Sequence, residues 1–418
     1  MKALHPTLLL ALLPALVSAE RPGPAAHLPH ARPESVGMSS AKLRLVDDKV
    51  NELIVGKRIA GASVMITRRG KLVYHRSFGL RDVENQLPME NDTIFRIYSM
   101  TKAITSAAAM ILVEEEKIRL EDPVAKYLPE YKEAKVWKEG KAVAPGVVPS
   151  VKDLLCHTAG YSYGTTGIPA VDKLHRAAGP FVETESLSEF VKRMSVVPMA
   201  FEPGQRWLYG ISTDLLGAVV ERASGQPLGQ FFRERLFAPL GMNDTGFTLP
   251  ADKRTRMAVA YQSNGKGTLT RHHHNLFSYS DRTKLHSGGG GLASTIGDYA
   301  RFLQMIANKG EFGGTRFLKK TTVSEMIRNQ LKGSAMPINF PNNVRHGTGF
   351  GLGFCVKVAQ TEWNKAGRLN EYGWGGMLST HYWASPRDEL VVVTMEQTLP
   401  YDFLLENALK PLIYDAIE

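Results

Sequence analysis

The spacing of apolar residues near the N-terminus predicts a helix followed by a hairpin. Between about residues 40 and 54, apolar positions form one stripe at helical spacing, and Ser39 or Ser40 stands where a helix cap is expected (Leu43, Val46, Val50, Leu53 and Ile54). The segment GASVMITRRGKLVYHRSFG then gives two β-rich runs joined by a turn at Arg69-Gly70. This pattern is typical of a β-hairpin.

A run that is apolar or small on every face follows the sequence YSMTK at residues 98–102 and continues to about Val113. Because this run has no polar face before the acidic stretch EEEK, we expect a buried helix. From about residue 120 to residue 285 the chain alternates between helical patterns and loops. Helix ends are predicted where glycine or proline follows an apolar pattern, at Gly160, Gly225, Pro239 and Gly310.

Strand character returns near the C-terminus, in the runs FGLGFCVKV, YGWGGMLSTHYWASP and ELVVVTMEQ, and a helical segment closes the chain. Strands at both ends with helices between them predict an α/β (α+β) fold. We expect an antiparallel sheet flanked by helices and built from both chain ends, with an inserted mainly helical domain. Residues 35–115 and 286–418 are assigned to the α/β domain, and residues 116–285 to the inserted domain.

The first residues have the pattern of a secretory signal peptide. Lys2 supplies a basic start, Leu8 to Val17 form an apolar core, and Val17 and Ala19 are small residues at the expected cleavage site. Residues 1–19 are therefore predicted to be removed before Glu20, which implies an exported protein, periplasmic or secreted. Residues 20–34 are rich in proline and predict a linker.

Composition excludes several classes of function. Hydrophobic content of 43% and charged content of 22% are ordinary for a globular protein, and the net charge of +10 is spread along the chain. The absence of a long Lys/Arg run argues against a nucleic-acid partner, and the apolar segments are too short to predict stable membrane insertion. Cys156 and Cys355 stand in apolar surroundings, which favours free thiols over a disulfide.

We expect no metal and no cofactor. The three histidines at 272–274 are adjacent on a predicted loop, where imidazoles rarely converge on one ion. The glycines of HGTGFGLGF lack the strand-then-helix context of a nucleotide-binding loop.

Two serines are candidate nucleophiles. Ser162 lies in GYSYG, which matches a G-x-S-x-G elbow, but that motif requires a sharp turn from a strand into a helix. Here a predicted helix precedes the motif and a poor helix sequence follows it, so Ser162 is interpreted as a loop residue.

Ser99 has a more favourable context, at the start of the predicted buried helix. The free N–H groups and the dipole of a helix N-terminus favour negative charge there, and Lys102 lies on the same helix face. A lysine inside an apolar helix is desolvated, which favours its neutral, proton-accepting form. From spacing alone, a helix cap followed by a surface lysine explains S-x-x-K equally well.

Further stretches give the chain a resemblance to a known family. FRIYSMTKAITSAAAMILVEEEKIRLEDPVAKYLPEY, LLCHTAGY, FEPGQRWLYGISTDLLGAVVERASGQ, SGGGGLASTIGDYARF and YGWGGMLSTHYWASP occur in the order found in serine β-lactamase-like hydrolases. The chain resembles most the branch that contains class C β-lactamases, D-alanyl-D-alanine carboxypeptidases and family VIII-like carboxylesterases. The resemblance covers nearly all of the chain after about residue 35.

The resemblance implies catalytic roles by matching motif. Ser99 would be the acylated nucleophile and Lys102 its proton acceptor, and Tyr209 matches the tyrosine of the Y-x-N motif that passes the proton to the leaving group. The oxyanion hole would consist of the amides of Ser99 and Met377. His157 is interpreted as organising a turn, and His381 as the base of a Ser-His-Asp triad is the alternative.

Two departures from the family pattern bear on the substrate. Ile211 replaces the asparagine of Y-x-N, and Trp374-Gly375-Gly376 replaces K-T-G, whose lysine meets a substrate carboxylate in β-lactamases and carboxypeptidases. An indole supplies an apolar wall and no positive charge, which favours an uncharged ester, and W-G-G resembles the esterase branch. The pocket walls are expected to be Tyr98, Tyr161, Tyr163, Trp374, Gly375 and Gly376.

The sequence therefore predicts a serine esterase that hydrolyses short-chain, uncharged carboxylic esters through an acyl-enzyme at Ser99, with transesterification as a further outcome. The alternatives are a penicillin-recognising D,D-peptidase or weak β-lactamase, and a catalytically inactive binding protein on the same scaffold. The partner would be a small-molecule ester. The oligomeric state is left open.

Overall fold

The structure is a computed structural model that describes residues 27–273, 275–340 and 343–418. The expected signal peptide at residues 1–19 and the first part of the expected linker lie outside these residues. Within the described ranges, no helix is both long and apolar enough to cross a membrane.

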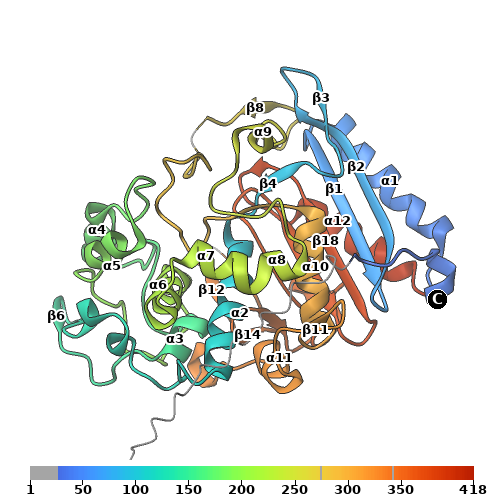
Figure 1. The fold of residues 1–418 in the computed structure, drawn as a ribbon. Coiled ribbons are helices and arrows are strands. Elements are labelled where there is room, and N and C mark those ends of the chain that lie inside the picture. The colour runs from blue at the N-terminus through green and yellow to red at the C-terminus, as the bar shows by residue number, and fades with distance from the viewer. Residues whose placement is uncertain (1–26, 274, 341–342) are drawn as a thin grey trace, which may run out of the picture.

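An eight-stranded antiparallel sheet forms the centre of the larger lobe (Figure 1). Its strands follow the order β14 (Thr348–Phe350), β15 (Cys355–Lys357), β16 (Tyr372–Gly375), β17 (His381–Ser385), β18 (Leu390–Met395), β1 (Gly61–Arg68), β2 (Lys71–Asp82) and β3 (Leu87–Pro88). In the middle of the sheet β1 pairs with β18, with Ser63 opposite Met395. The sheet is therefore built from both ends of the chain, and the predicted fold class is confirmed.

Helices cover both faces of this sheet. On the outer face lie α1 (Ser40–Val55) and α12 (Leu404–Asp415), and on the inner face lie α10 (Ile296–Ala307) and α2 (Thr101–Glu114) (Figure 1). Every residue of β1 is buried, and successive side chains enter opposite cores: Val64 and Ile66 pack with α1 and α12, whereas Met65 belongs to the inner cluster. Burial on both faces explains why the sequence of β1 does not alternate between apolar and exposed polar residues.

The smaller lobe consists mainly of helices and loops. Its helices are α3 (Val151–Cys156), α4 (Pro169–Ala178), α5 (Leu187–Met194), α6 (Ser212–Ser224), α7 (Leu228–Phe232), α8 (Ala238–Leu240) and α9 (Ala251–Arg254). Short strands accompany them: β5 (Val136–Lys138), β6 (Lys141–Val143), β7 (Tyr261–Ser263) and β8 (Leu269–Arg271). Most of the helices fall between residues 116 and 285, and the exact bounds of the two domains stay a prediction.

The helix ends test the sequence predictions individually. Helix α6 ends at Gly225 as expected, because glycine adopts the left-handed conformation there. Helix α3 ends earlier than Gly160, at His157, which has a φ of 57°. Helix α7 runs on through a π-helical turn (Arg233–Phe237) and α8 to Gly241, so Pro239 does not end it. Helix α10 ends at Ala307, before Gly310.

The remaining strands and the remaining α-helix of the described residues are short. They are β4 (Ile94–Arg96), β9 (Ala293–Thr295), β10 (Glu311–Phe312), β11 (Thr315–Arg316), α11 (Lys320–Met326), β12 (Asn339–Phe340), β13 (Asn343–Val344) and β19 (Thr398–Leu399). Two of the C-terminal β runs each take part in a hairpin: FGLGFCVKV runs from the end of β14 into β15, and YGWGGMLSTHYWASP forms β16 and β17. Strand β16 lies beside the turn Tyr98–Met100 that precedes α2.

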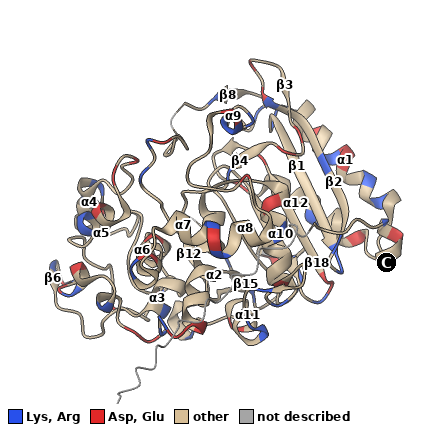
Figure 2. Ribbon diagram, viewed as in Figure 1, with Lys and Arg blue, Asp and Glu red and all other residues tan. Residues whose placement is uncertain are grey.

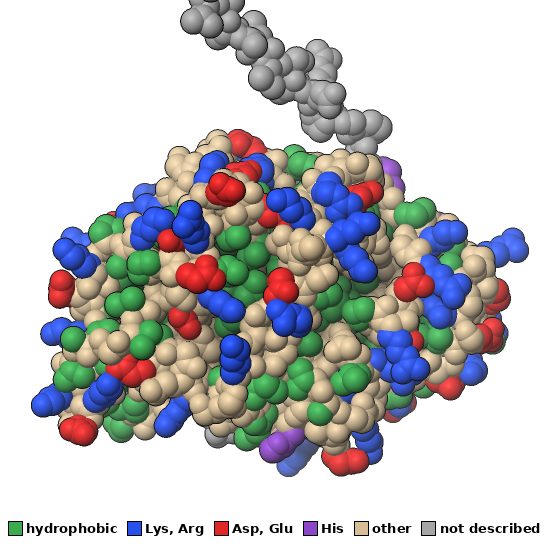
Figure 3. All heavy atoms as spheres, turned by 90° about the horizontal axis from the view of Figure 1, so that it is seen from below, with side chains coloured by type: hydrophobic (Ala, Val, Ile, Leu, Met, Phe, Trp, Pro, Cys, Tyr) green, Lys and Arg blue, Asp and Glu red, His purple; other side chains and the backbone are tan. Residues whose placement is uncertain are grey.

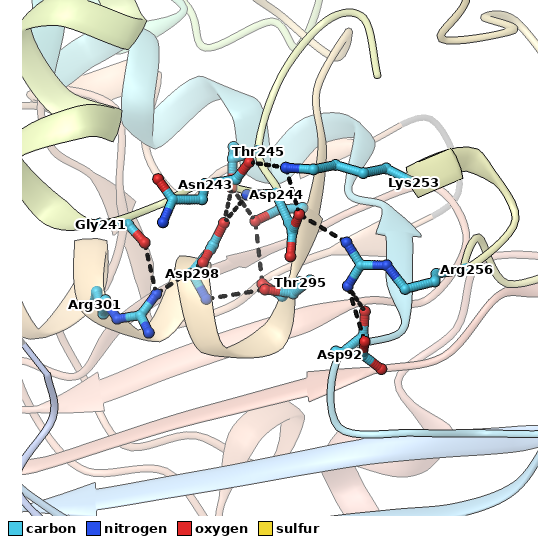
Figure 4. Close-up of polar contacts among 11 residues, drawn as sticks. Asp92, Gly241, Asn243, Asp244, Thr245, Lys253, Arg256, Thr295, Asp298 and Arg301 are labelled. Atoms are coloured by element: carbon cyan, nitrogen blue, oxygen red, sulfur yellow. Dashed lines mark hydrogen bonds and ion pairs between the residues drawn. The ribbon is translucent and has the colours of Figure 1, made fainter. Parts of the chain in front are cut away.

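A polar network fastens the segment before α9 to the start of α10 (Figure 4). The Asp298 carboxylate accepts hydrogen bonds from the Asp244 amide at 2.8 Å and the Thr245 hydroxyl at 3.0 Å. The Asp244 carboxylate in turn pairs with Arg256, which also pairs with Asp92 before β4. These contacts hold residues distant in sequence next to the inner face of the sheet.

Charged side chains are distributed over the whole chain. Figure 2 shows acidic and basic residues interspersed on helices and loops, and Figure 3 shows hydrophobic side chains between charged ones on one face of the molecule. The described surface therefore agrees with the even charge distribution of the sequence.

Candidate active site

Ser99 lies in a single 3₁₀ turn, Tyr98–Met100, that leads directly into α2. Tyr98 has a φ of 39°, an uncommon conformation for a residue with a side chain. Both residues line a cavity of about 430 Å³. Ser99 thus faces this cavity from the N-terminal end of a helix, and that helix is buried, as the sequence predicts.

Lys102 is brought against Ser99 from the next helical turn. Its ammonium nitrogen lies 3.3 Å from Ser99 Oγ, and it donates hydrogen bonds to the Tyr163 hydroxyl at 3.0 Å and the Gly289 carbonyl at 2.6 Å. Only 1% of the residue is exposed. Its contacting oxygen atoms all belong to uncharged groups.

Tyr209 lines the same cavity and packs against the lysine. The Lys102 ammonium lies 4.7 Å from the centre of the Tyr209 ring, and the Tyr209 hydroxyl accepts a hydrogen bond of 3.2 Å from the Trp374 indole. The structure therefore groups the three predicted catalytic residues around one cavity. The role of Tyr209 in proton transfer stays a prediction.

Asp214 is a buried carboxyl group behind Lys102 that sequence reasoning missed. Burial raises the pKa of this carboxyl, while the nearby Lys102 ammonium and the Ser287 hydroxyl oppose the rise. The Tyr163 hydroxyl lies 3.4 Å from Asp214 Oδ2 and so connects the carboxyl with Lys102. An acidic residue in the first turn of the apolar helix α6 is the only sequence signal for it.

The end of β16 approaches the Ser99 turn closely. A side chain at Gly376 would place its first carbon 2.3 Å from the Ile97 carbonyl oxygen, so this position requires glycine. Met377 follows, lines the cavity, and its amide donates no hydrogen bond to any described residue. The Met377 amide thus has no acceptor among the described residues, and its role in an oxyanion hole stays a prediction.

The predicted pocket walls divide into two groups. Tyr98, Tyr163, Trp374, Gly375 and Gly376 line the cavity. Tyr161 does not, and this prediction is corrected: its ring is buried edge-on against Tyr131, with centroids 5.5 Å apart. The ring of Tyr161 packs into the hydrophobic core from an irregular loop, so sharing a short motif with Tyr163 does not bring it to the cavity. Sequence reasoning missed Phe181, Leu276, Phe277, Ser287, Gly289, Gly290, Phe340, Arg345 and Tyr401, which also line it.

Ser162, the alternative nucleophile, is buried in a loop. Ser162 is buried in the loop after α3, and its hydroxyl oxygen accepts a hydrogen bond of 3.0 Å from the Gly164 amide. No strand leads into the motif and no helix starts from it, so the G-x-S-x-G elbow is not formed.

The two candidate histidines contact residues other than Ser99. His157 ends α3, and its Nε2 lies 3.3 Å from the Thr213 hydroxyl. Burial, together with the charge of Lys102, holds the pKa of His157 well below its usual value. On β17, His381 Nε2 lies 3.2 Å from the Tyr401 hydroxyl. The predicted turn role of His157 agrees with this geometry.

The cysteines and the histidine cluster were considered for a disulfide and for metal binding. Cys156 and Cys355 are free thiols, and burial raises their pKa values to about 12 and about 11. Among the described residues, no group of three or more His, Cys, Asp or Glu could hold a metal ion. His274 lies outside these residues, so the cluster at 272–274 is only partly described.

Comparison with known proteins finds sequences similar to most of this chain. A family model described as "Beta-lactamase" matches residues 46–410. The chain is 32% identical to protein Rv1367c of Mycobacterium tuberculosis over 84% of its own length and 89% of that protein. It is 30% identical to esterase EstB of Burkholderia gladioli, over 91% and 98% of the two chains.

Among solved structures, the chain is similar to EstCE1, described as a hydrolase with promiscuous acyltransferase activity. The TM-score is 0.78 at 25% identity, and the match covers 90% of this chain and 98% of that one.

Proposed function

The chain belongs to the beta-lactamase family, as an esterase or acyltransferase with the fold of that family, and from this premise we propose that it is a serine carboxylesterase acting through an acyl-enzyme at Ser99. The observation that carries the proposal is the contact of the buried Lys102 ammonium with Ser99 Oγ beside a cavity. A nucleophilic hydroxyl requires a base within hydrogen-bonding reach, and this pair supplies one.

The proposed reaction has two steps. Ser99 Oγ attacks the ester carbonyl carbon and passes its proton to Lys102, while the amides of Ser99 and Met377 hold the oxyanion. Tyr209 then donates its hydroxyl proton to the departing alcohol and is reprotonated by Lys102, which leaves Ser99 acylated and Lys102 neutral again. Water repeats the attack on the acyl-enzyme, releases the acid and restores the serine.

The cavity supports a small ester as substrate. Its volume of about 430 Å³ is at the lower end of the range for small-molecule sites, and most of its lining is aromatic or aliphatic. We propose short acyl chains on this ground. The expectation of an uncharged ester rests on Ile211 and Trp374, and the wall of the cavity that contains Trp374 also contains Arg345.

Acyl transfer to an alcohol is a second outcome of the same intermediate. EstCE1 is described as a hydrolase with promiscuous acyltransferase activity, and an alcohol that enters the cavity in place of water would take the acyl group from Ser99. The ratio of ester to acid formed in the presence of an added alcohol measures this outcome.

Ser99→Ala tests the proposed function. We expect this variant to lose p-nitrophenyl butyrate hydrolysis by about 10³-fold or more, because it lacks the hydroxyl proposed to attack the ester. Ser162→Ala is the matched control and should keep its activity. A fluorophosphonate probe should label the wild-type peptide that contains Ser99, as followed by mass spectrometry.

Three results would contradict the proposal: full activity of Ser99→Ala, labelling at another residue, or no labelling. Nitrocefin hydrolysis measured beside p-nitrophenyl butyrate separates the esterase from the β-lactamase alternative. Faster turnover of nitrocefin would favour the penicillin-recognising enzyme.

We also propose that the protein is exported, with cleavage before Glu20. The support is the sequence pattern of residues 1–19. N-terminal sequencing of the mature protein from cell fractions tests both points.

A further inference from the structure

Arg345 places a buried positive charge in the wall of the proposed ester-binding cavity. It lies between β13 and β14, only 6% of its surface is exposed, and it lines the cavity together with Phe340 and Trp374. No sequence pattern indicated a cation in this wall, since Trp374 occupies the position of the family's lysine.

Aromatic rings surround the Arg345 guanidinium. Its central carbon lies 4.5 Å from the ring centre of Phe340, 4.9 Å from that of Phe403, 5.0 Å from that of Trp374 and 5.4 Å from that of Trp363. Ring faces attract a cation and fix its plane. They accept no conventional hydrogen bond, so the guanidinium is held in place with donor capacity left over.

No carboxylate of the described residues contacts this guanidinium. No ion pair joins Arg345 to any residue that the structure describes, and its Nε is buried without a hydrogen-bond partner. Tyr401 is its polar neighbour: burial raises the pKa of the Tyr401 hydroxyl, and the charge and hydrogen bonding of Arg345 oppose that rise. The charge of Arg345 also helps to lower the pKa of the Glu406 carboxyl, but Glu406 forms its ion pair with Lys410 at 2.6 Å, so no described anion is in direct contact with the guanidinium.

Other buried cations of the described chain contact oxygen atoms of the protein. Lys410 lies between two carboxylates, while Arg68, Lys357 and Lys102 donate to backbone carbonyls (Glu371 and Glu406; Gly37 and Asp388; Gly367; Gly289). Buried charges are ordinarily paired, because an unpaired charge away from water is costly. Arg345 differs from these cations because, among the described residues, its polar contact is a phenol and neither a carboxylate nor a backbone carbonyl, and it lies at the cavity wall.

We propose that Arg345 binds a free carboxylate on the substrate, so that the preferred ester carries an anionic group besides the bond that is cleaved. This inference rests on the proposed esterase function and names its substrate class, esters with one free carboxylate. A guanidinium fits a carboxylate with two parallel hydrogen bonds, and a water-poor aromatic setting strengthens them. Trp374 thus acts as a platform for a cation from the segment between β13 and β14, and the proposed ester is anionic where the sequence predicted an uncharged one.

Two esters that differ only in the free carboxylate test the inference. Monoethyl glutarate and ethyl pentanoate have the same reacting ester and five-carbon acyl chain, and ethanol release reports hydrolysis of both. The measured quantity is the ratio of kcat/KM for the half-ester to kcat/KM for the neutral ester. We expect Arg345→Met to lower this ratio by about 10- to 100-fold, mainly through KM, because it removes a charge-assisted hydrogen bond.

Two further variants separate binding from general damage. Arg345→Lys keeps the charge but not the planar fork, so its ratio should lie between those of the wild type and Arg345→Met. Arg69→Met removes one positive charge from an exposed ion pair with Glu389, and its ratio should match the wild type. If Arg345→Met does not fold, Arg345→Lys must by itself lower the ratio.

Binding to the Ser99→Ala protein gives a readout that does not depend on turnover. Calorimetry should detect monoethyl glutarate more tightly bound than ethyl pentanoate, and adding Arg345→Met should abolish the difference. An unchanged ratio in both Arg345 variants, an equal loss in Arg69→Met, or the absence of any half-ester preference in binding overturns the inference. If ethyl pentanoate is still cleaved in that case, the esterase proposal stands. If neither ester is cleaved but carboxylate binding depends on Arg345, the esterase proposal fails and the inference stands.

Discussion

Lys102 and Lys410 are both buried, with 1% and 2% of their surfaces exposed, yet the atoms around their ammonium groups differ. Lys410 lies 2.6 Å from carboxylate oxygens of both Glu371 and Glu406. Burial lowers the pKa of Lys410, but these two carboxylates raise it above its ordinary value. Lys102 contacts two hydroxyls and a backbone carbonyl, none of which is charged.

The difference separates a structural cation from a candidate catalyst. An ammonium group between two carboxylates keeps its proton, because both partners favour the charged form. Lys102 contacts neutral oxygen atoms only among the described residues, and the nearby Asp214 carboxyl contacts the Tyr163 hydroxyl instead of the lysine. Burial alone therefore does not indicate catalysis, whereas the charge of the neighbours does.

Lys102→Met should break the comparison most strongly. We expect kcat/KM for p-nitrophenyl butyrate to fall by about 10³- to 10⁴-fold, because the proton acceptor for Ser99 is lost. Lys173→Met, at an exposed lysine of α4, is the control and should have normal activity. A Lys102→Met protein with more than a tenth of the wild-type rate would show that another group accepts the proton.

Lys410→Met should instead reduce stability. Removing the ammonium leaves Glu371 and Glu406 buried without their cation, and we expect the free energy of unfolding to fall by about 3–5 kcal/mol. Lys126→Met removes a lysine at the same i,i+4 spacing from an exposed pair with Asp122, and should leave the free energy of unfolding nearly unchanged. Urea denaturation of the three proteins measures both values. Equal losses in the two variants would contradict the distinction between buried and exposed pairs.

Local patterns predicted much of the fold. The turn at Arg69-Gly70, the buried helix after residue 100 and the glycine end of α6 each depend on a few neighbouring residues, and each is present. The predicted helix ends were less accurate where tertiary contacts determine the end of the helix. Pro239 is tolerated near the start of α8, and His157 adopts the left-handed conformation expected of a glycine.

The residues that surround the candidate catalytic residues could not be predicted from such local patterns. S-x-x-K placed Ser99 and Lys102 one turn apart, and family motifs indicated Tyr209. The Gly289 carbonyl lies 187 positions from Lys102 along the chain, and no spacing rule connects them. Arg345 was missed for the same reason, since its aromatic neighbours come from separate segments of the C-terminal half.

Tyr163→Phe sharpens the comparison by removing one of the neutral oxygen atoms around Lys102. Its hydroxyl accepts a hydrogen bond from the lysine and lies 3.4 Å from Asp214, so its loss should loosen the lysine without exposing it. We expect kcat to fall by about 3- to 10-fold, which corresponds to one ordinary hydrogen bond, with little change in stability.

Tyr161→Phe is the matched control for this smallest effect. Tyr161 is buried two residues away, its hydroxyl has no hydrogen-bond partner, and it does not line the cavity, so kcat should stay at the wild-type value. Equal effects of the two substitutions would mean that the tyrosines act only through packing. A loss confined to Tyr163→Phe would show that the hydroxyl positions the lysine, because the rings remain and one oxygen atom alone distinguishes the variants.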